Sequence, residues 1–407
     1  MRLPSRLRVA LDRARTSYFA IPALGVVGGV VLAILTLWID HIGLPFEVPL
    51  AVEKMSDARS LINTIASTSI SVAATVFSIT IVVLSLASSQ FGPRLLRNFL
   101  KNRSSQFVLA HFVGTHAYCL VALRTVGTGW DIPQLTCLIA LLAALAGASA
   151  LIYFIHHTAQ WVQADRVIGV VADALDDELE RMTGDKPGYH DAERCRPEAE
   201  PNSVVLARRS GYVQALDDER LLLLAERHDL VIERRVVAGE YVFKGRPVAA
   251  LWGDCDDEVI GSIQATFGQD DTRSDLQDPF HLVDQLVELA LRALSPGIND
   301  PITAVRVLDR LGSAFLPFLA ASPRPLMDPE GEQARVLATA PDVAALIDRA
   351  FGEIRRAGSH QHLVVRRLAH VLPVLAEVTE DVAVGRALQR ERDALPAVHP
   401  LGLAKPS

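Results

Sequence analysis

Four long stretches without a formal charge dominate the first 156 residues of this chain. A hydrocarbon core about 30 Å thick is crossed by about 20 helical residues, so each stretch is long enough to span a bilayer. We therefore expect a membrane domain of four transmembrane α-helices over 1–156, with the spans at 18–39, 62–90, 105–126 and 132–156.

Basic residues set the expected orientation of these spans. Residues 1–156 hold twelve Lys or Arg against six Asp or Glu, and nine of the twelve lie before the first span or between the second and third. The positive-inside rule then places both chain ends in the cytoplasm. Cations alternate with Leu and Phe just after the second span, which predicts a short interfacial helix that contacts lipid headgroups. These headgroup candidates are Arg94, Arg97, Lys101 and Arg103.

The second span carries a stripe of hydroxyl side chains at an alternating spacing of four and three residues, interrupted at Val82. On a helix this spacing forms one continuous face. A buried hydroxyl without a partner costs a few kcal/mol, so we do not expect this face to point at acyl chains. Two interpretations remain: a pore lining around a shared axis, or a tight helix–helix seam. The candidate residues are Thr64, Thr68, Ser71, Thr75, Ser78, Ser85 and Ser89.

The remainder of the chain is acidic. Residues 157–407 hold 28 Lys or Arg and 41 Asp or Glu, a net charge of −13. This charge argues against nucleic acid as a partner, because phosphate binding needs a basic surface. The four cysteines show no paired spacing, so no disulfide framework or zinc site is indicated. No phosphate-binding loop, nucleophile elbow or His-Glu-x-x-His motif occurs, so we expect no enzymatic activity, no cofactor and no metal.

This acidic region is expected to be a cytoplasmic α+β part. Helical periodicity continues after the fourth span, so 157–202 is predicted as a projecting helix and a linker. Short β-branched runs separated by turn residues predict a small barrel- or sandwich-like β-module over 203–268. Residues 269–407 are predicted as a helical domain, with helices after the first at about 302–320, 333–356 and 361–394.

A bend interrupts the helical pattern of this last domain. Asp300 is a plausible helix N-cap, and the following proline suits the first helical position. The bend is either a ligand-binding element at a helix N-terminus or a well-capped corner between two helices. Its residues of interest are Ser295, Pro296, Gly297, Asn299, Asp300 and Pro301.

The segment 290–304, Ala-Leu-Arg-Ala-Leu-Ser-Pro-Gly-Ile-Asn-Asp-Pro-Ile-Thr-Ala, resembles the signature of a bacterial family of predicted membrane proteins, domain of unknown function 2254 (DUF2254). Residues 88–97 and 210–213 are similar to other recurring segments of that family. The likeness covers nearly the whole chain. It implies a location in the bacterial inner membrane and no particular activity.

Two hypotheses for the function follow. In the first, the chain forms a homo-oligomeric channel or solute pathway for an ion or small solute, lined by the second span. In the second, the chain is a membrane-anchored interaction or sensor protein without transport activity. In both hypotheses the lipid bilayer is a partner.

Overall fold

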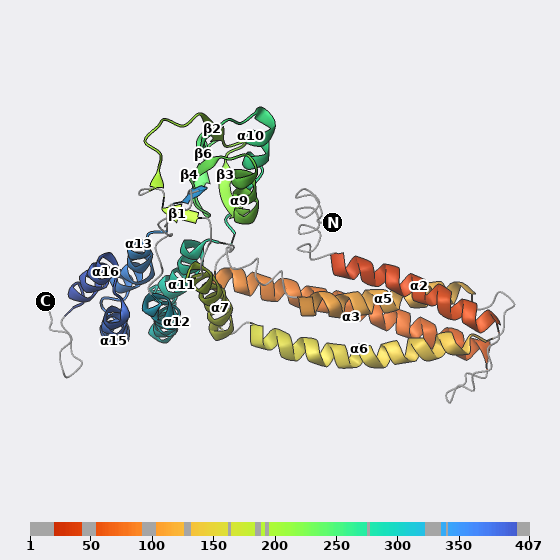
Figure 1. The fold of residues 1–407 in the computed structure, drawn as a ribbon. Coiled ribbons are helices and arrows are strands. Elements are labelled where there is room, and N and C mark those ends of the chain that lie inside the picture. Colours follow the sequence, from red (N-terminus) through yellow and green to blue (C-terminus); the bar gives the residue numbers. More distant parts are fainter. Residues whose placement is uncertain are drawn as a thin grey trace. The chain divides into compact units, whose positions relative to one another are not determined.

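A computed structural model of the chain describes residues 20–42, 54–91, 103–125, 132–161, 164–183, 189–191, 195–274, 277–321, 335–338 and 341–396. The chain divides into two compact units, Met1–Gln163 and Ala164–Ser407. Figure 1 shows the elements of both units along the chain.

Unit 1 contains four helices that are long and apolar enough to cross a membrane, as the sequence predicted. They are α2 (Ala20–Ile42), α3 (Met55–Phe91), α5 (Arg103–Thr125) and α6 (Gln134–Trp161). The 37 residues of α3 extend over about 55 Å, which exceeds the thickness of a hydrocarbon core. Its ends therefore reach beyond the lipid tails unless the helix tilts strongly.

Helix α5 is the central helix of unit 1. Its apolar window is 56% buried, against 17–22% for the other three helices, and it packs against α2, α3 and α6. The contact with α2 is backbone to backbone, because a Cβ on Gly25 would lie 2.5 Å from the carbonyl oxygen of Ala110. A Cβ on Gly29 would overlap the carbonyl of Gly114 in the same way. Small residues thus allow the two helices to approach closely.

Unit 2 begins with helix α7 (Ala164–Thr183). It lies in the segment predicted as a projecting helix, and it packs against two later helices, α11 (Pro279–Ala293) and α12 (Pro301–Ala320). Its buried face includes Val167, Val171 and Leu175, at the helical spacing seen in the sequence. Helix α7 is therefore part of the core of unit 2.

Two sheets form the β part of unit 2. The five-stranded sheet has the order β1-β8-β4-β6-β2 and the three-stranded sheet has the order β5-β3-β7. The strands are β1 (Tyr189–Asp191), β2 (Ser203–Leu206), β3 (Gly211–Leu216), β4 (Val231–Arg234), β5 (Tyr241–Val242), β6 (Pro247–Trp252), β7 (Phe267–Asp270) and β8 (Val336–Ala338). Strands β1 and β8 fall in the predicted linker and the predicted helical domain, and β8 pairs parallel with β1 and with β4.

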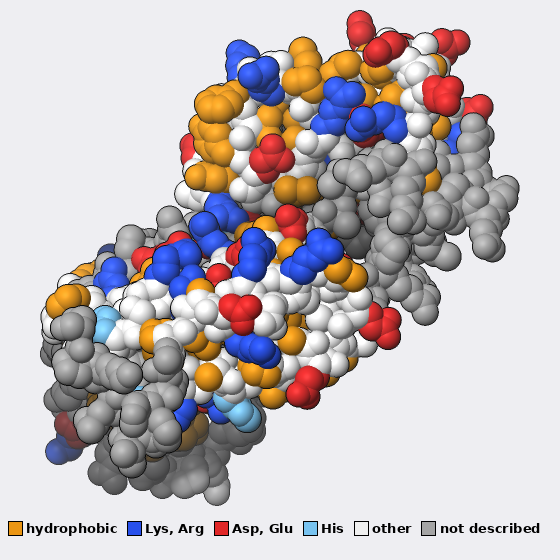
Figure 2. Space-filling model, turned by 90° about the vertical axis from the view of Figure 1, so that its left-hand side faces the viewer, with side chains coloured by type: hydrophobic (Ala, Val, Ile, Leu, Met, Phe, Trp, Pro, Cys, Tyr) orange, Lys and Arg blue, Asp and Glu red, His pale blue; other side chains and the backbone are white. Residues whose placement is uncertain are grey.

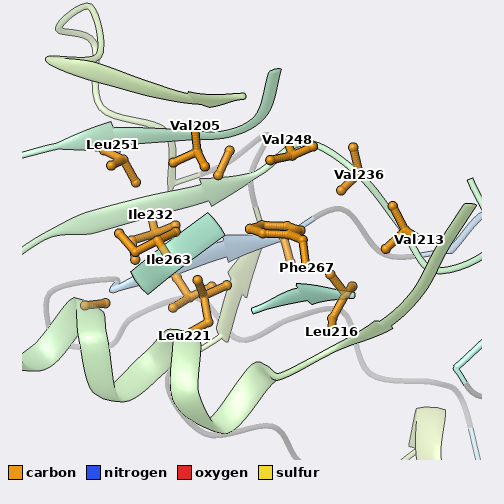
Figure 3. Packing of buried hydrophobic residues seen from close by; sticks show 14 of the residues in the cluster. Val205, Val213, Leu216, Leu221, Ile232, Val236, Val248, Leu251, Ile263 and Phe267 are labelled. Atoms are coloured by element: carbon orange, nitrogen blue, oxygen red, sulfur yellow. The ribbon is translucent and has the colours of Figure 1, made fainter. Parts of the chain in front are cut away.

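Residues from both sheets and two helices share one hydrophobic core in this β part. The helices are α9 (Asp218–Arg227) and α10 (Asp257–Gln264), and each begins with an aspartate cap, Asp217 or Asp256. In Figure 3, Leu221 of α9 and Ile263 of α10 lie among buried side chains of the strands, such as Ile232 and Phe267. The first positions of β3 alternate between buried and half-buried because successive side chains point to opposite faces, whereas Val248–Trp252 of β6 and all of β8 are buried on both faces.

The helical part of unit 2 differs in detail from the prediction. The predicted helix at 333–356 starts only at α13 (Val343–Ile347), after strand β8, and continues as the π-helical turn η1 (Asp348–Gly352) and α14 (Glu353–Ala357). The predicted helix at 361–394 is two helices, α15 (His362–Val378) and α16 (Val382–Asp393). They separate at 379–381, where Asp381 accepts hydrogen bonds from the first N–H groups of α16.

Candidate functional site

The predicted hydroxyl stripe lies on the surface of unit 1, on the side of α3 that faces away from the other three helices. Helix α3 packs against α5 and α6 through the opposite side, which buries Ile62, Ala66 and Ala73. Thr64, Thr68 and Thr75 each lie two positions after one of these buried residues. Two positions on a helix are about 200° apart, so the stripe points away from the packed side. The exposed hydroxyl residues are Thr64, Thr68, Ser71, Thr75, Ser78 and Ser85. The side chain of Ser89 lies outside the described part of the structure.

Hydroxyl groups of the stripe donate to carbonyl oxygens of their own helix. Ser71 Oγ donates to the carbonyl of Ser67 at 2.8 Å, and Thr75 Oγ1 donates to that of Ser71 at 3.1 Å. Thr64 makes the same bond to the carbonyl of Ser60 at 2.8 Å. These bonds satisfy the hydroxyl protons without any other helix. Each hydroxyl oxygen keeps lone pairs that can accept from water or from a second helix.

The exposed polar face is wider than the sequence pattern indicated. Ser60, Asn63 and Ser67 are also exposed, and the Ser67 hydroxyl donates to the carbonyl of Asn63 at 2.9 Å. These residues lie next to the stripe rather than on the single four-and-three spacing. A count of all polar positions on that half of the helix would have found them.

Two histidines of α5 join it to its neighbours. His116 Nδ1 lies 2.9 Å from the carbonyl oxygen of Ala66 on α3, and His111 Nε2 lies 2.9 Å from that of Ala143 on α6. A carbonyl only accepts, so each of these ring nitrogens donates. The histidines therefore join α5 to α3 and to α6 by hydrogen bonds, in addition to the packing of the helices.

A polar network ties three helices at the end of the bundle where α2 ends and α6 begins. The Asp40 carboxylate of α2 accepts from the N–H groups of Leu135 and Thr136, at 3.0 Å each, and from the Thr136 hydroxyl at 2.7 Å. Tyr118 of α5 donates to the carbonyl of Thr136 at 3.0 Å and lies 3.0 Å from the Thr36 hydroxyl. Asp40 thus caps the first turn of a different helix.

The predicted bend of unit 2 is a capped corner between α11 and α12. Asp300 accepts from the N–H groups of Ile302 and Thr303 and from the Thr303 hydroxyl, at 3.1, 3.2 and 2.6 Å. These hydrogen bonds hold the pKa of Asp300 below its ordinary value. Asn299 has a φ of +49° and accepts from the Gln361 side chain at 2.9 Å. Ser295 Oγ donates to the carbonyl of Arg292.

The remaining residues of this bend, Pro296, Gly297 and Pro301, belong to the turn and to the first position of α12. The carboxylate of Asp300 is engaged by its own helix, and this geometry favours the structural interpretation of the bend. The predicted headgroup residues Arg94, Arg97 and Lys101 lie outside the described residues, as does the side chain of Arg103.

A network of two arginines and two aspartates joins the loop before α11 to η1. Arg273 donates to both carboxylate oxygens of Asp278, at 2.8 and 2.9 Å, and to Asp284 at 3.2 Å. Arg349 of η1 donates to the same Asp284 oxygen as Arg273, at 3.1 Å. Burial raises the pKa of Asp278, and Arg273 opposes that effect. Arg349 lies 65 residues after Asp284, so no local pattern in the sequence predicts that part of the network.

In the described ranges, no group of three or more His, Cys, Asp or Glu residues is placed to hold a metal ion. Among the described residues of unit 1, the most distinctive surface is the polar face of α3.

The fold of unit 1 defines a membrane protein with four apolar helices. The chain belongs to the DUF2254 family of predicted membrane proteins, whose sequence profile matches residues 15–373. It is 31% identical over 429 residues to an uncharacterised protein of Mycobacterium bovis, Mb1321c, over 95% of this chain and 79% of that protein. The Mycobacterium tuberculosis protein Rv1290c matches with the same identity and coverage. No solved structure matches.

Proposed function

We propose that this chain forms a homo-oligomer in the bacterial inner membrane in which α3 of each copy turns its polar face to a shared axis, as a channel or solute pathway. The observation that carries the proposal is the outward position of that face. The hydrocarbon core offers no partner to the oxygen lone pairs or to the Asn63 amide. A second copy of the same helix, with water along the axis, provides such partners.

The composition of the polar face bears on what passes along it. Residues 60–93 contain no Lys, Arg, Asp or Glu, so the lining carries hydroxyl and amide dipoles and no fixed charge. Such a lining favours a small neutral solute or a hydrated ion without strong charge selection. The face also includes the exposed apolar residues Val82 and Leu86, so the polar lining is denser over 60–78 than over the last turns.

The orientation is part of the proposal. Nine of the twelve cations of residues 1–156 precede the first span or lie between the second and third, which supports cytoplasmic chain ends. Reporter fusions after residue 47 and after residue 407 test this directly. An alkaline phosphatase active only at the first position agrees with the proposal, and activity at the second contradicts it.

The decisive experiment combines cross-linking and conductance on the purified full chain. Ser71→Cys is expected to form disulfide-linked dimers under mild oxidation because copies of the residue face one axis. The matched control is Ser149→Cys, since Ser149 is also an exposed serine that donates to the carbonyl four residues earlier, but on α6.

Planar bilayers supply the functional measurement. We expect conductance from the wild-type chain, loss of conductance in the double variant Ser71→Leu, Ser78→Leu, and no change in Ser149→Leu. Cross-linked oligomers without conductance would indicate that the α3 face is a seam between helices. That result would favour the alternative function, a membrane-anchored interaction or sensor protein. A monomeric wild type would overturn the oligomer itself.

A further inference from the structure

Two neighbouring loops of the β part of unit 2 bring four exposed cations together. One loop, 207–210, follows β2, and the other, 243–246, follows β5. Backbone hydrogen bonds join the loops: the Ala207 N–H donates to the carbonyl of Arg246 at 2.8 Å, and the Gly245 N–H donates to that of Ala207 at 3.0 Å. The four exposed cations are Arg208, Arg209, Lys244 and Arg246. Because these bonds fix the loops to each other, the cations form one surface.

Exposed apolar side chains lie on the same surface. Phe243 is 63% exposed although it is one of the largest apolar side chains, and Tyr241 and Leu206 are also exposed. The rings form a chain: Tyr212 and Tyr241 have centroids 5.0 Å apart, and Tyr241 and Phe243 have centroids 5.3 Å apart, both edge to face. Phe243, the first residue of the loop 243–246, is thus in ring contact with Tyr241 and remains exposed. We call the four cations with Leu206, Tyr241 and Phe243 the Phe243 face.

Few acidic groups oppose these cations. Segments 203–216 and 241–253 contain no Asp or Glu, and the acidic residues that flank them in the chain are Asp217, Glu240 and Asp254. Arg209 lies 3.6 Å from the Asp270 carboxylate, and Arg208 donates to the neutral side chain of Gln264. Within the described residues, no ion pair is found for Lys244 or Arg246. The face therefore keeps most of its positive charge.

The attraction of the Phe243 face for an anion depends more on the charges near it than on the negative net charge of residues 157–407. The Debye length is about 8 Å at physiological ionic strength, so an approaching anion responds to the nearest side chains. The four cations of the Phe243 face are concentrated in two loops, whereas the net charge of −13 is spread over residues 157–407. In Figure 2, basic and hydrophobic side chains lie next to each other on the part of the molecule that carries the strands.

We propose that the Phe243 face docks on the anionic headgroups of the bilayer that carries this chain. Lys and Arg beside exposed aromatic rings match the two layers of such a surface: phosphates attract the cations, and the ring enters the boundary of the acyl region. The four apolar helices already hold the chain in that bilayer, so even a weak contact forms at high effective concentration. This inference is independent of the proposed channel.

Photo-cross-linking of the full chain in lipid nanodiscs tests the proposal. p-Benzoylphenylalanine replaces Phe243 in one variant and Leu223 in the control. Leu223 lies on α9 of the same β part and is equally exposed, at 63%. Nanodiscs contain either phosphatidylglycerol or phosphatidylcholine, and lipid adducts are measured by the mass of the intact protein. A third variant adds Lys244→Glu and Arg246→Glu to the probe at position 243.

The expected result is a lipid adduct at position 243 in phosphatidylglycerol and none above background at 223. The double charge reversal is expected to lower that adduct about tenfold or more, since each cation near an anionic surface contributes to binding. Equal adducts at 243 and 223, or an adduct that is independent of phosphatidylglycerol, would overturn the proposal. A cross-link from position 243 to a second copy of the chain would also overturn it and would indicate a protein partner.

Discussion

The close contact between α2 and α5 allows a quantitative prediction for Gly25→Ala. The new Cβ would lie 2.5 Å from the Ala110 carbonyl oxygen and 2.9 Å from its carbonyl carbon, whereas ordinary contact begins at 3.4 Å. The backbone of Ala110 therefore has to move by about 0.9 Å, the difference between 3.4 and 2.5 Å. Both partners are helix backbone, so the helices separate instead of a side chain turning away.

We expect this separation to lower the free energy of unfolding by about 1–3 kcal/mol, the usual cost of an overfilled core. The control is Gly28→Ala on the same helix, where an added Cβ meets nothing within 4 Å. Because alanine favours helix over glycine, that variant is expected to be neutral or slightly stabilised.

The assay is equilibrium unfolding of the purified chain in mixed micelles with an increasing mole fraction of dodecyl sulfate, followed by tryptophan fluorescence. A second comparison sharpens the test. Adding Ala110→Gly to Gly25→Ala is expected to give no rescue, because the overlap is with the backbone of Ala110 and not with its methyl group. Equal unfolding midpoints for Gly25→Ala and Gly28→Ala, or full rescue by Ala110→Gly, would refute the proposed packing.

Three further predictions concern single sites. Gly239→Ala is expected to lower the melting temperature much more than Gly245→Ala: both glycines have positive φ, but only the Cβ at 239 would overlap the Asp278 carboxylate. Asp40→Ala leaves N–H groups at the start of α6 without their acceptor and is expected to cost about 1–3 kcal/mol in the micelle assay, whereas a neutral result would contradict the cap. Because the pKa of Asp300 is lowered in the folded state, its charged cap stabilises the fold fully above the ordinary pKa of 3.8. This stabilisation is lost as the pH falls through the folded pKa. Asp300→Asn is therefore expected to lose less stability in acid than the wild type, as measured by circular dichroism.

The sequence by itself determined those helices, strands and caps that depend only on residues close together in the chain. Bilayer thickness requires long uncharged helices, so the existence of the four spans could be predicted from the uncharged runs, although α3 begins at Met55, before the predicted start at 62. Most strands lie in the segment 203–268, which β-branched runs between turns predicted as a β-module, and Asp300 was recognised as a cap from its place before a proline.

The tertiary structure decided which faces meet. The hydroxyl pattern of α3 is the same whether that face points inward or outward, and the packing of α5 against its opposite side makes it outward. Helix α11 lies in the predicted helical domain, but only the structure shows that it buries His281, Asp284 and Gln285, because other elements surround it.

Strand β8, the Asp40 cap of α6 and the Asp284–Arg349 pair depend on residues far apart in the chain, so no local pattern predicts them. Periodicity reports which residues share a face of one element. The partner of that face is selected by the packing of the whole fold, and this is why the exposed polar side of α3 and the Phe243 face became visible only in three dimensions.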